Sequence, residues 1–389
     1  MKFSRTLAAL AAFAALSLAH QLRAQPRPVT LLFAGDTTLD GAAGEFIAQG
    51  GDPLAPFAEL LRQADVRVAN LECVVATKGD ASGKIYTFRA HPRVLPVLAR
   101  HLDGVTLANN HSGDFGREAF AEMLDLLAAQ GLAQVGGGRN LAQAHTPWLI
   151  ERQGLRIALL SYSEFMPRSF EADHNAPGIA WSEDERVVDD IRRARRVHRA
   201  DLVIPIMHWG WENELRANAR QRQLARRMIE AGADAVIGGH PHVTQDIEQH
   251  RGKPIVYSVG NFVMQETDNE RQREGWLLRR TWTSRAWPAL TRTWRAWTCR
   301  ACLVTKPARP APAGGAGRTG RACAGRVCPS PARAKPGSCC AARRRPAGAA
   351  RPRPARPPGA PPGPGPNPGE PIRPPRPPPA GRPESRCSQ

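Results

Sequence analysis

Residues 104–111 read Gly-Val-Thr-Leu-Ala-Asn-Asn-His, a mostly apolar run that passes directly into two amides and an imidazole. A short apolar run bounded by polar residues is typical of a strand that is buried in a sheet. Amides and imidazoles at the end of such a strand need partners, because burying them without hydrogen bonds destabilises the fold. The segment therefore predicts a buried strand over Gly104–Ala108 with a polar cluster at its carboxyl end.

The same pattern recurs along the first 275 residues, where it alternates with helical patterns. Further strands are predicted at Val29–Ala34, Val66–Leu71, Leu202–Met207, Ala235–Ile237 and Ile255–Val259, with a hairpin at Trp148–Arg152 and Leu155–Tyr162. Helices are predicted at Pro56–Ala64, Pro92–His101, Glu118–Gln130, Ser182–Arg199 and Arg216–Ala231. This alternation of strands and helices predicts an α/β domain.

Helix ends carry recognisable signals. Gly131 and Gly232 follow two of the helical patterns, and glycine at that position commonly ends a helix. Ser182 precedes Glu185 by three residues, which predicts a capping box at the start of the helix there.

The charge of the chain is unevenly distributed. The 389 residues have a formal net charge of +19, but residues 276–389 carry 23 Lys and Arg against two acids, a net +21. Residues 1–275 therefore hold 31 Lys and Arg against 33 acids, a net −2. This distribution excludes a uniformly basic globular protein, and we expect no nucleic-acid partner.

Residues 1–24 have the features of a secretory signal peptide. Lys2 and Arg5 precede an apolar run from Leu7 to Ala19, and Ala24 supplies a small residue at the predicted cleavage site. The run is shorter than the roughly 20 residues that span a bilayer. The alternatives are an uncleaved anchor and a buried helix. We expect an exported protein that is periplasmic, secreted or associated with the membrane at the cell envelope.

Residues 279–389 are predicted to be a disordered tail. Residues 276–389 contain 24 of the 36 prolines and seven of the eight cysteines, and they show no apolar periodicity that could build a core. A Pro-rich basic arm is one interpretation. Five tryptophans within Trp276–Trp297 argue against it, because disordered arms are poor in tryptophan. We therefore interpret the tail as the product of a frameshift.

Polar residues that follow the predicted strands form the candidate site. They are Asp36, Asn70, Glu72, Asn109, Asn110, His111, Asp114, His208, Glu212, His240, His242 and Asn261. Ligands of open α/β sheets bind beyond the carboxyl ends of the strands, so we expect these residues at one edge of one sheet. Imidazole with carboxylate is the ligand set of Zn, Mn or Fe, and carboxylates that bridge two ions serve phosphoester hydrolysis.

Each motif taken alone also has an ordinary structural explanation. Gly35-Asp36 could be a turn, and Asn70-Leu71-Glu72 could be an exposed strand end. His240-Pro241-His242 could be a solvated loop, although Gly238-Gly239 before it permits close approach of the backbone and suits chelation. The occurrence of all these motifs after strands favours a functional site.

Other motifs do not support a site. Cys299-x-x-Cys302 and the Cys323 and Cys328 pair lie in Pro/Arg-rich sequence, and the second pair has the wrong spacing for a zinc ribbon. The arginines of residues 192–196 are predicted to be the solvated face of a helix. The sequence contains no P-loop, no dinucleotide-binding glycine motif and no Gly-x-Ser-x-Gly elbow.

Six motifs, in order along the chain, carry a resemblance to a known family. They are Phe33-Ala34-Gly35-Asp36, Asn70-Leu71-Glu72, Leu107-Ala108-Asn109-Asn110-His111 with Asp114 and Gly116, His208-Trp209-Gly210-Trp211-Glu212, Gly239-His240-Pro241-His242, and Tyr257-Ser258-Val259-Gly260-Asn261-Phe262. Over residues 29–278 the chain resembles the CapA family of poly-γ-glutamate capsule biosynthesis proteins, which are similar in fold to calcineurin-like metallophosphatases. The resemblance implies a layered αββα sandwich with its site at the strand ends, in a protein that acts at the cell envelope.

The resemblance also implies roles for single residues. The metal ligands would be Asp36, Glu72, Asn110, His208, His240 and His242, holding one or two divalent ions of Mn, Fe or Zn. His111 would be the catalytic residue that protonates a leaving oxygen, together with Asp114. The substrate-binding residues would be Asn70, Asn109, Glu212 and Asn261.

Two departures from the phosphatase pattern bear on the metal. Phosphatases usually place a histidine two residues after the first aspartate, where this chain has Thr38. The second motif places Glu72 in an Asn-Leu-Glu in place of the usual Gly-Asp pair. One of the two metal positions is therefore expected to be weaker or empty.

Two classes of function stay open at the level of sequence. The first is a capsule-type envelope protein whose metal site hydrolyses or transfers a phosphoester or a γ-glutamyl amide. The second is a non-catalytic partner that binds or exports an anionic polymer within an envelope complex and keeps only part of the site.

Overall fold

The computed structural model describes residues 28–165, 168–265 and 267–282, together with the backbone of three further strands. These strands are β17 (Trp294–Arg300), β18 (Cys302–Val304) and β19 (Cys328–Pro329). The predicted signal peptide and most of the predicted tail lie outside the described residues. None of the helices in this described part is long and apolar enough to cross a membrane.

The first sheet is built around β1 (Val29–Thr37), which pairs in parallel with β2 (Val66–Leu71). The sheet continues through β5 (Gly104–Thr106) and β6 (Ala133–Val135), again in parallel. On its other side β1 pairs in parallel with β15 (Asn261–Gln265) and antiparallel with β16 (Glu274–Trp282). Beyond β16 lie β17 and then β19, while β18 pairs with β15.

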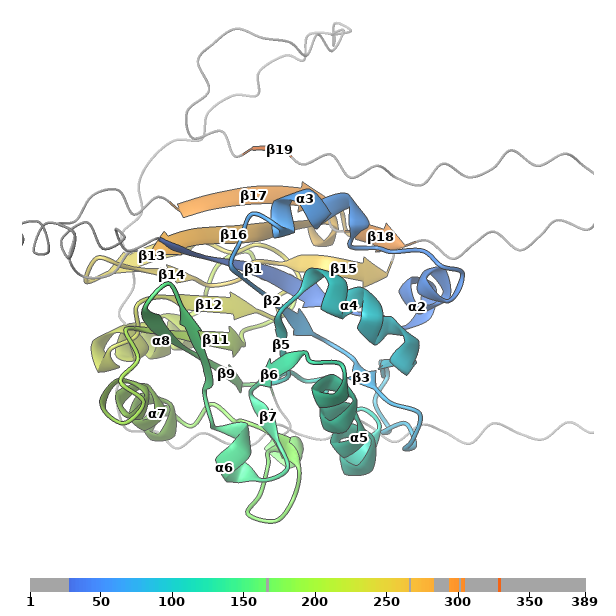
Figure 1. Cartoon of the computed structure of the whole chain (residues 1–389), viewed down its shortest axis with the longest axis horizontal. Coiled ribbons are helices and arrows are strands. Elements are labelled where there is room, and N and C mark those ends of the chain that lie inside the picture. The colour runs from blue at the N-terminus through green and yellow to red at the C-terminus, as the bar shows by residue number, and fades with distance from the viewer. Residues whose placement is uncertain are drawn as a thin grey trace, which may run out of the picture. The chain divides into compact units, whose positions relative to one another are not determined.

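The second sheet, which packs against the first (Figure 1), has a parallel centre and antiparallel edges. Its order is β13 (Ile247–His250), β14 (Lys253–Val256), β12 (Val236–Gly239), β11 (Leu202–His208), β9 (Leu155–Ser163) and β8 (Trp148–Arg152). The four central strands are parallel, whereas β13 pairs antiparallel with β14 and β8 pairs antiparallel with β9. The predicted hairpin of β8 and β9 is thereby confirmed.

Helices cover the outer face of each sheet. The helices of the first sheet are α2 (Gly41–Ala48), α3 (Ala58–Leu61), α4 (Leu95–His101) and α5 (Gly116–Ala129). Those of the second sheet are α7 (Asp184–Arg196) and α8 (Ala219–Ala231). The short elements are β3 (Val74–Val75), β4 (Arg89–Ala90), β7 (Gly137–Gly138), β10 (Gly178–Ile179), α6 (Leu141–Ala144) and the 3₁₀ turns Ala55–Phe57, Pro92–Val94, Arg168–Phe170 and Glu270–Arg273.

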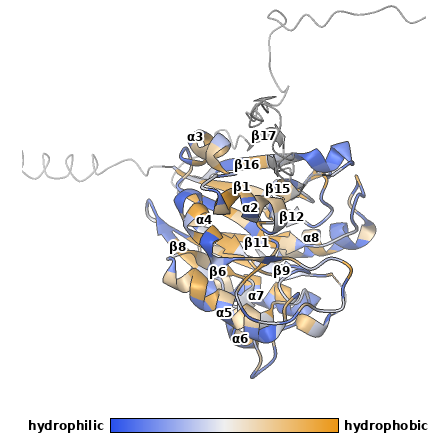
Figure 2. Cartoon of the chain, turned by 90° about the vertical axis from the view of Figure 1, so that its right-hand side faces the viewer, coloured by the Kyte–Doolittle hydropathy of each residue, from blue (hydrophilic) through white to orange (hydrophobic). Residues whose placement is uncertain are grey.

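The alternation of side chains along the strands explains why the two sheets stack. In β1, Leu31 and Phe33 enter a core between the sheets, while Leu32 packs among the helices of the first sheet. In β11, Ile204 faces the same central core and Val203 faces the helices of the second sheet. Successive side chains of a strand point to opposite faces, so strands that are apolar at every position are buried on both sides. Figure 2 shows apolar residues along the strands of both sheets.

The predicted layered αββα sandwich is confirmed: helices, first sheet, second sheet, helices. Most predicted elements are present, with shorter or shifted ends. The helix predicted at Pro56–Ala64 is a 3₁₀ turn followed by the four residues of α3.

The predicted capping box at Ser182 is wrong. The N-cap of α7 is Glu183, which makes no side-chain cap. The Ser182 N–H instead donates to the carbonyl of Ser163, which holds that segment extended. A capping box does exist at α8, between Asn218 and Gln221, where the sequence analysis placed helix and not a cap.

The first sheet runs past the boundary predicted at residue 278. β16 continues to Trp282, because it pairs with β1 as far as Val29, which lies opposite Trp282. Leu277 and Leu278 are fully buried, as in the other strands of this sheet. The tail prediction from residue 279 therefore begins too early, whereas the frameshift itself stays a prediction.

Candidate metal centre

The predicted ligands meet where the carboxyl ends of strands from both sheets converge. Asp36 lies near the end of β1, and Glu72 follows the last residue of β2. His208 is the last residue of β11, and His240 directly follows β12. All of these side chains are almost completely buried. The expectation of one edge of one sheet is wrong, because both faces of these strands are apolar and local sequence does not say which sheet a buried strand joins.

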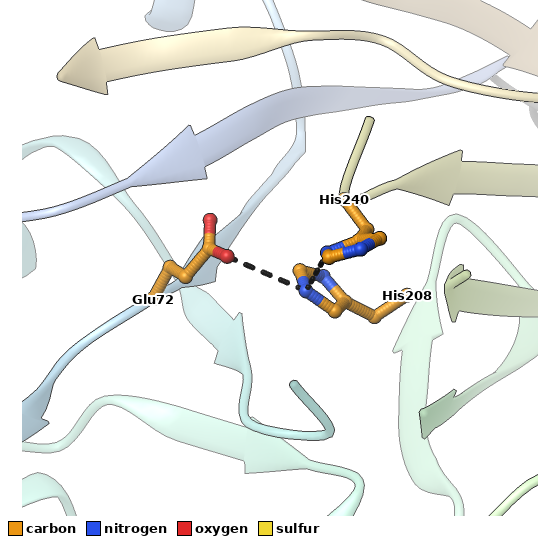
Figure 3. Close-up of side chains that lie close together, drawn as sticks. All are labelled: Glu72, His208 and His240. Carbon is orange, nitrogen blue, oxygen red and sulfur yellow. Dashed lines mark hydrogen bonds and ion pairs between the residues drawn. The ribbon is translucent and has the colours of Figure 1, made fainter. Parts of the chain in front are cut away.

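Glu72, His208 and His240 form the first group of possible ligands (Figure 3). Glu72 Oε1 lies 3.3 Å from His208 Nε2. The same His208 nitrogen lies 3.1 Å from Nδ1 of His240. One ligand atom of each residue lies within 4.8 Å of the other two, which is close enough for one ion to contact all three.

Asp36, Glu72 and His242 form a second group of the same size. His242 Nδ1 lies 3.4 Å from Asp36 Oδ2, and His242 Nε2 lies 3.8 Å from Glu72 Oε1. Glu72 therefore belongs to both groups. A carboxylate shared in this way is the arrangement that bridges two metal ions in hydrolytic sites.

The hydrogen bonding of these residues indicates that a cation belongs here. Among the described residues, both carboxylate oxygens of Glu72 and Nε2 of His240 are buried without a hydrogen-bond partner. A buried carboxylate that lacks donors is strongly unfavourable unless a positive charge compensates it. Carboxylate and imidazole are also the donor set that Zn, Mn and Fe prefer. The residues present therefore fit a divalent metal ion.

Asn110 extends the first group. Its Oδ1 lies 2.6 Å from His208 Nε2, and the residue lies within the loop between β5 and α5. An amide oxygen in that place can serve as a further oxygen ligand. The first group thus has four candidate ligands, and the second group has three.

Thr38 does not fill the gap in the second group. Its hydroxyl is buried and donates to the backbone carbonyl of Glu72 at 3.4 Å. The residue that stands where phosphatases usually place a histidine therefore supports the backbone of a ligand. The unequal number of ligands agrees with the expectation that one position is weaker.

In the second group, the carboxylate of Asp36 and the imidazole of His242 carry opposite charges. Burial would raise the pKa of Asp36, but hydrogen bonds and charges from His242, His208 and Asn70 outweigh it and hold this pKa well below its ordinary value. Burial lowers the pKa of His242, but the negative charges of Glu72 and Asp36 outweigh it and raise this pKa to about 10. Without a metal, His242 therefore carries the positive charge that offsets the two carboxylates.

His240 has the opposite character. Burial, followed by electrostatic interactions with the neighbouring imidazoles of His208 and His242, holds the pKa of His240 well below its ordinary value. Its ring is therefore neutral near pH 7, which is the form of imidazole that binds metal ions.

Glycines allow these ligands to approach one another. A Cβ on Gly239 would lie 2.9 Å from Asp36 Oδ1, and a Cβ on Gly35 would lie 1.8 Å from the carbonyl oxygen of Gly260. His240 and His242 themselves have positive φ values of 93° and 57°, which L residues other than glycine rarely adopt. Strain of this kind persists where the surrounding structure over-determines it, and it concentrates at functional sites.

Asn70 and Asn109 form a chain of hydrogen bonds that ends on the ligand Asp36. Asn70 Nδ2 donates to Asp36 Oδ1 at 2.8 Å, and Asn70 Oδ1 accepts from Asn109 Nδ2 at 3.0 Å. Both residues are buried. Their amides are used within the protein and orient Asp36, although the resemblance had implied contact with substrate.

Asn261 and Glu212 lie in different surroundings. Asn261 is buried, and its Oδ1 lies 2.9 Å from His242 Nδ1. It therefore fixes the ring of a predicted ligand. Glu212 is exposed on the loop after β11 and lies outside the buried group.

His111 and Asp114 form a hydrogen-bonded pair beside the ligands. His111 Nδ1 lies 2.7 Å from Oδ2 of Asp114, whose carboxylate is fully buried. Lys84, which was not among the predicted site residues, joins this pair. Its Nζ lies 2.6 Å from Asp114 Oδ1 and also donates to the backbone carbonyl of Asn110. A lysine in a polar loop gives no local signal that it will reach a buried carboxylate 30 residues away.

Comparison with known proteins gives an independent result. Residues 30–266 match the family described as "Bacterial capsule synthesis protein PGA_cap". The "PGA biosynthesis protein CapA" of Bacillus subtilis (strain 168) is 32% identical over 242 residues, which are 60% of this chain and 63% of that protein. The "Probable polyglutamine synthesis accessory protein Rv0574c" of Mycobacterium tuberculosis (strain ATCC 25618 / H37Rv) is 32% identical over 210 residues, 51% of this chain and 55% of that protein. The chain thus spans less than two thirds of the length of these relatives.

Solved structures were also found at low similarity. A hypothetical protein from Thermus thermophilus is 15% identical with a TM-score of 0.43, covering 69% of this chain and 99% of that one. A structure titled as a novel phosphatase, from Mycoplasma pneumoniae, is 16% identical with a TM-score of 0.41, covering 66% of this chain and 87% of that one.

Proposed function

Because this chain belongs to the bacterial capsule synthesis protein PGA_cap family, we propose that it acts on a poly-γ-glutamate-type polymer at the cell envelope. Two relatives are named for PGA biosynthesis and for polyglutamine synthesis, and a third, from Bacillus anthracis, is named for capsule biosynthesis. The signal-like segment of residues 1–24 supports export. These names support the further proposal of an anionic polymer as substrate and of an envelope synthesis or export complex as partner.

The proposed activity is metal-dependent hydrolysis or transfer, on a γ-glutamyl amide or a phosphoester. The observation that carries it is Glu72, a buried carboxylate shared by two groups of ligands and without hydrogen-bond donors among the described residues. Glu72, His208, His240 and Asn110 would hold one ion, and Asp36, Glu72 and His242 the other. Ions there would supply Lewis-acid polarisation of the substrate oxygen.

Residues of the protein would exchange the proton with the substrate and orient the metal ligands. Asp114 accepts the hydrogen bond of His111 Nδ1, so Nε2 of His111 is the atom that can exchange a proton with a leaving oxygen. Lys84 compensates the charge of Asp114 and so holds the pair in place. Asn70 fixes Asp36, and Asn261 fixes His242, so that these two of the three second-group side chains are oriented before a ligand arrives.

A second candidate function is non-catalytic binding or export of the polymer. Thr38 favours it, because the second group has three ligands where a phosphatase-like site would have a further histidine. A protein with one occupied position could keep the fold and bind an anion without turnover.

Metal content and turnover, measured together, test the proposal. The full chain is purified without chelators, its Mn, Fe and Zn are quantified, and hydrolysis of a generic phosphodiester and of poly-γ-glutamate is followed with and without added Mn²⁺. We expect bound metal and metal-stimulated turnover that Glu72→Gln abolishes. A wild-type chain with neither bound metal nor metal-stimulated turnover would refute the proposed metal-dependent activity. Non-catalytic binding or export of the polymer would then be the remaining candidate function.

A further inference from the structure

The three most exposed large apolar side chains of the described residues lie on segments that border the metal centre. Ile85 is 93% exposed, Tyr86 is 70% exposed and Trp211 is 67% exposed. Single exposed apolar residues are common on protein surfaces. Three of them beside one site, each more exposed than any other large apolar side chain described, indicate a surface that contacts something.

Ile85 and Tyr86 are presented by a loop that is fixed on both sides. Before them, Lys84 Nζ lies 2.6 Å from Asp114 Oδ1. After them, the Phe88 N–H donates to Asp114 Oδ2 at 2.8 Å. The loop is therefore tied at both ends to the same buried carboxylate.

These anchors place the pair close to the predicted catalytic imidazole. The ring of Phe88 lies 4.5 Å from that of His111, measured between centroids. Consecutive Cα atoms are about 3.8 Å apart, so Tyr86 can lie no more than about 8 Å along the chain from Phe88. Ile85 and Tyr86 therefore border the His111 side of the centre.

Trp211 is held in a similar way on the loop that follows β11. It follows His208 by three residues, and the fully buried Trp209 between them donates its indole N–H to the carbonyl of Tyr257 at 2.9 Å. On the other side, the Asn213 N–H donates to the carbonyl of Pro241, which lies between the two histidines His240 and His242. Trp211 therefore borders the histidine side of the centre.

We propose that Ile85, Tyr86 and Trp211, the apolar rim, hold the polymer substrate across the metal centre. The inference rests on the proposed function and adds the residues that recognise the chain. The occupant is an extended γ-linked polyglutamate, whose backbone carries methylene groups between its amides and free carboxylates beside them. Aliphatic and aromatic side chains bury such methylene groups favourably.

The fixed geometry of the rim makes this recognition effective. Because both loops are held by hydrogen bonds before any ligand binds, little conformational entropy is lost when the polymer arrives. Rings with few rotatable bonds lose less than flexible chains would.

Binding of a defined polymer tests the rim. Isothermal titration of the full-length chain with γ-linked glutamate oligomers of one length is compared for wild type, Tyr86→Ser, Trp211→Ser and the double variant. Leu149→Ser on β8 and Ile247→Ser on β13 serve as controls, since these side chains are also exposed, by 41% and 50%, but lie on edge strands of the second sheet. Metal content is measured in every variant.

We expect each rim substitution to weaken binding about tenfold, as truncation of an aromatic contact commonly does, with metal content and the controls unchanged. If wild type binds the oligomer and the rim variants bind equally well, the rim is refuted and the proposed function stands. If a parallel titration shows that wild type binds an anionic polysaccharide of equal charge density more tightly than the glutamate oligomer, the assignment of the occupant is refuted. If wild type binds neither polymer, the proposed function fails together with the rim.

Discussion

Replacing Glu72 by glutamine should remove both metal ions at once. Glu72 is the one residue shared by the two ligand groups, so its charge serves both positions. Glutamine keeps the shape of the side chain and removes the charge, which limits damage to packing. Loss of a residue that merely orients a ligand lowers metal affinity by about 10–100-fold, so loss of a charged ligand should cost at least about 100-fold at each position. That factor is about 2.7 kcal/mol per ion.

The assay is metal stoichiometry after dialysis against a weak chelator, followed by titration of Mn²⁺ and Zn²⁺. The informative comparison is His208→Asn, which removes a residue of the first group only and should leave one ion bound. Glu164→Gln is the matched control, because Glu164 is a largely buried carboxylate paired with Arg220 and belongs to neither group. Wild-type stoichiometry and affinity in Glu72→Gln would refute the shared-ligand arrangement.

Three further predictions follow from the same geometry. Burial lowers the pKa of His242, but the carboxylates beside it raise that pKa to about 10. The metal-free protein should therefore lose stability as pH rises from about 6.5 through 10. Urea unfolding in excess chelator at pH 6 and pH 10 measures this loss, and equal stability at both pH values would contradict the prediction. Gly239→Ala should lower metal affinity by about tenfold or more, because the new Cβ would lie 2.9 Å from Asp36 Oδ1; unchanged Mn²⁺ titration would count against the close approach. Asp114→Asn should lower turnover by about 100-fold with metal content unchanged, since it leaves His111 without its carboxylate partner; equal loss of metal would instead assign Asp114 a structural role.

The strands and their polar ends could be predicted because both signals are local. An apolar run such as Leu202–Met207 predicts a buried strand wherever it lies, and His208 is conspicuous directly after it. Two glycines before His240 indicate close packing, and the structure places the carboxylate of Asp36 against one of them.

The stacking of two sheets could not be predicted from those patterns. Strands of one doubly covered sheet and strands of a two-sheet sandwich are both apolar on each face, so β1 and β11 look alike. The αββα arrangement came from the family resemblance, and the structure confirms it through the central core that both strands share.

Residues that act through long-range contacts also could not be predicted from the sequence. Lys84 meets Asp114 only because two loops fold together, and nothing near Lys84 in the sequence marks it. The missed helix α2 begins at Gly41 and contains two glycines, which oppose helix formation, although Asp40 caps it by accepting from the Gly41 N–H. Tertiary packing of Ala43 and Ile47 against the first sheet compensates.

The most direct test of the account is the anomalous scattering of crystals grown with Mn²⁺. We predict two peaks, about 3.5–4 Å apart, on either side of the Glu72 carboxylate. The peak beside His208 and His240 should be the stronger, because that group has the additional oxygen of Asn110. No peak within bonding distance of Glu72 would contradict the central claim that this carboxylate joins two metal positions.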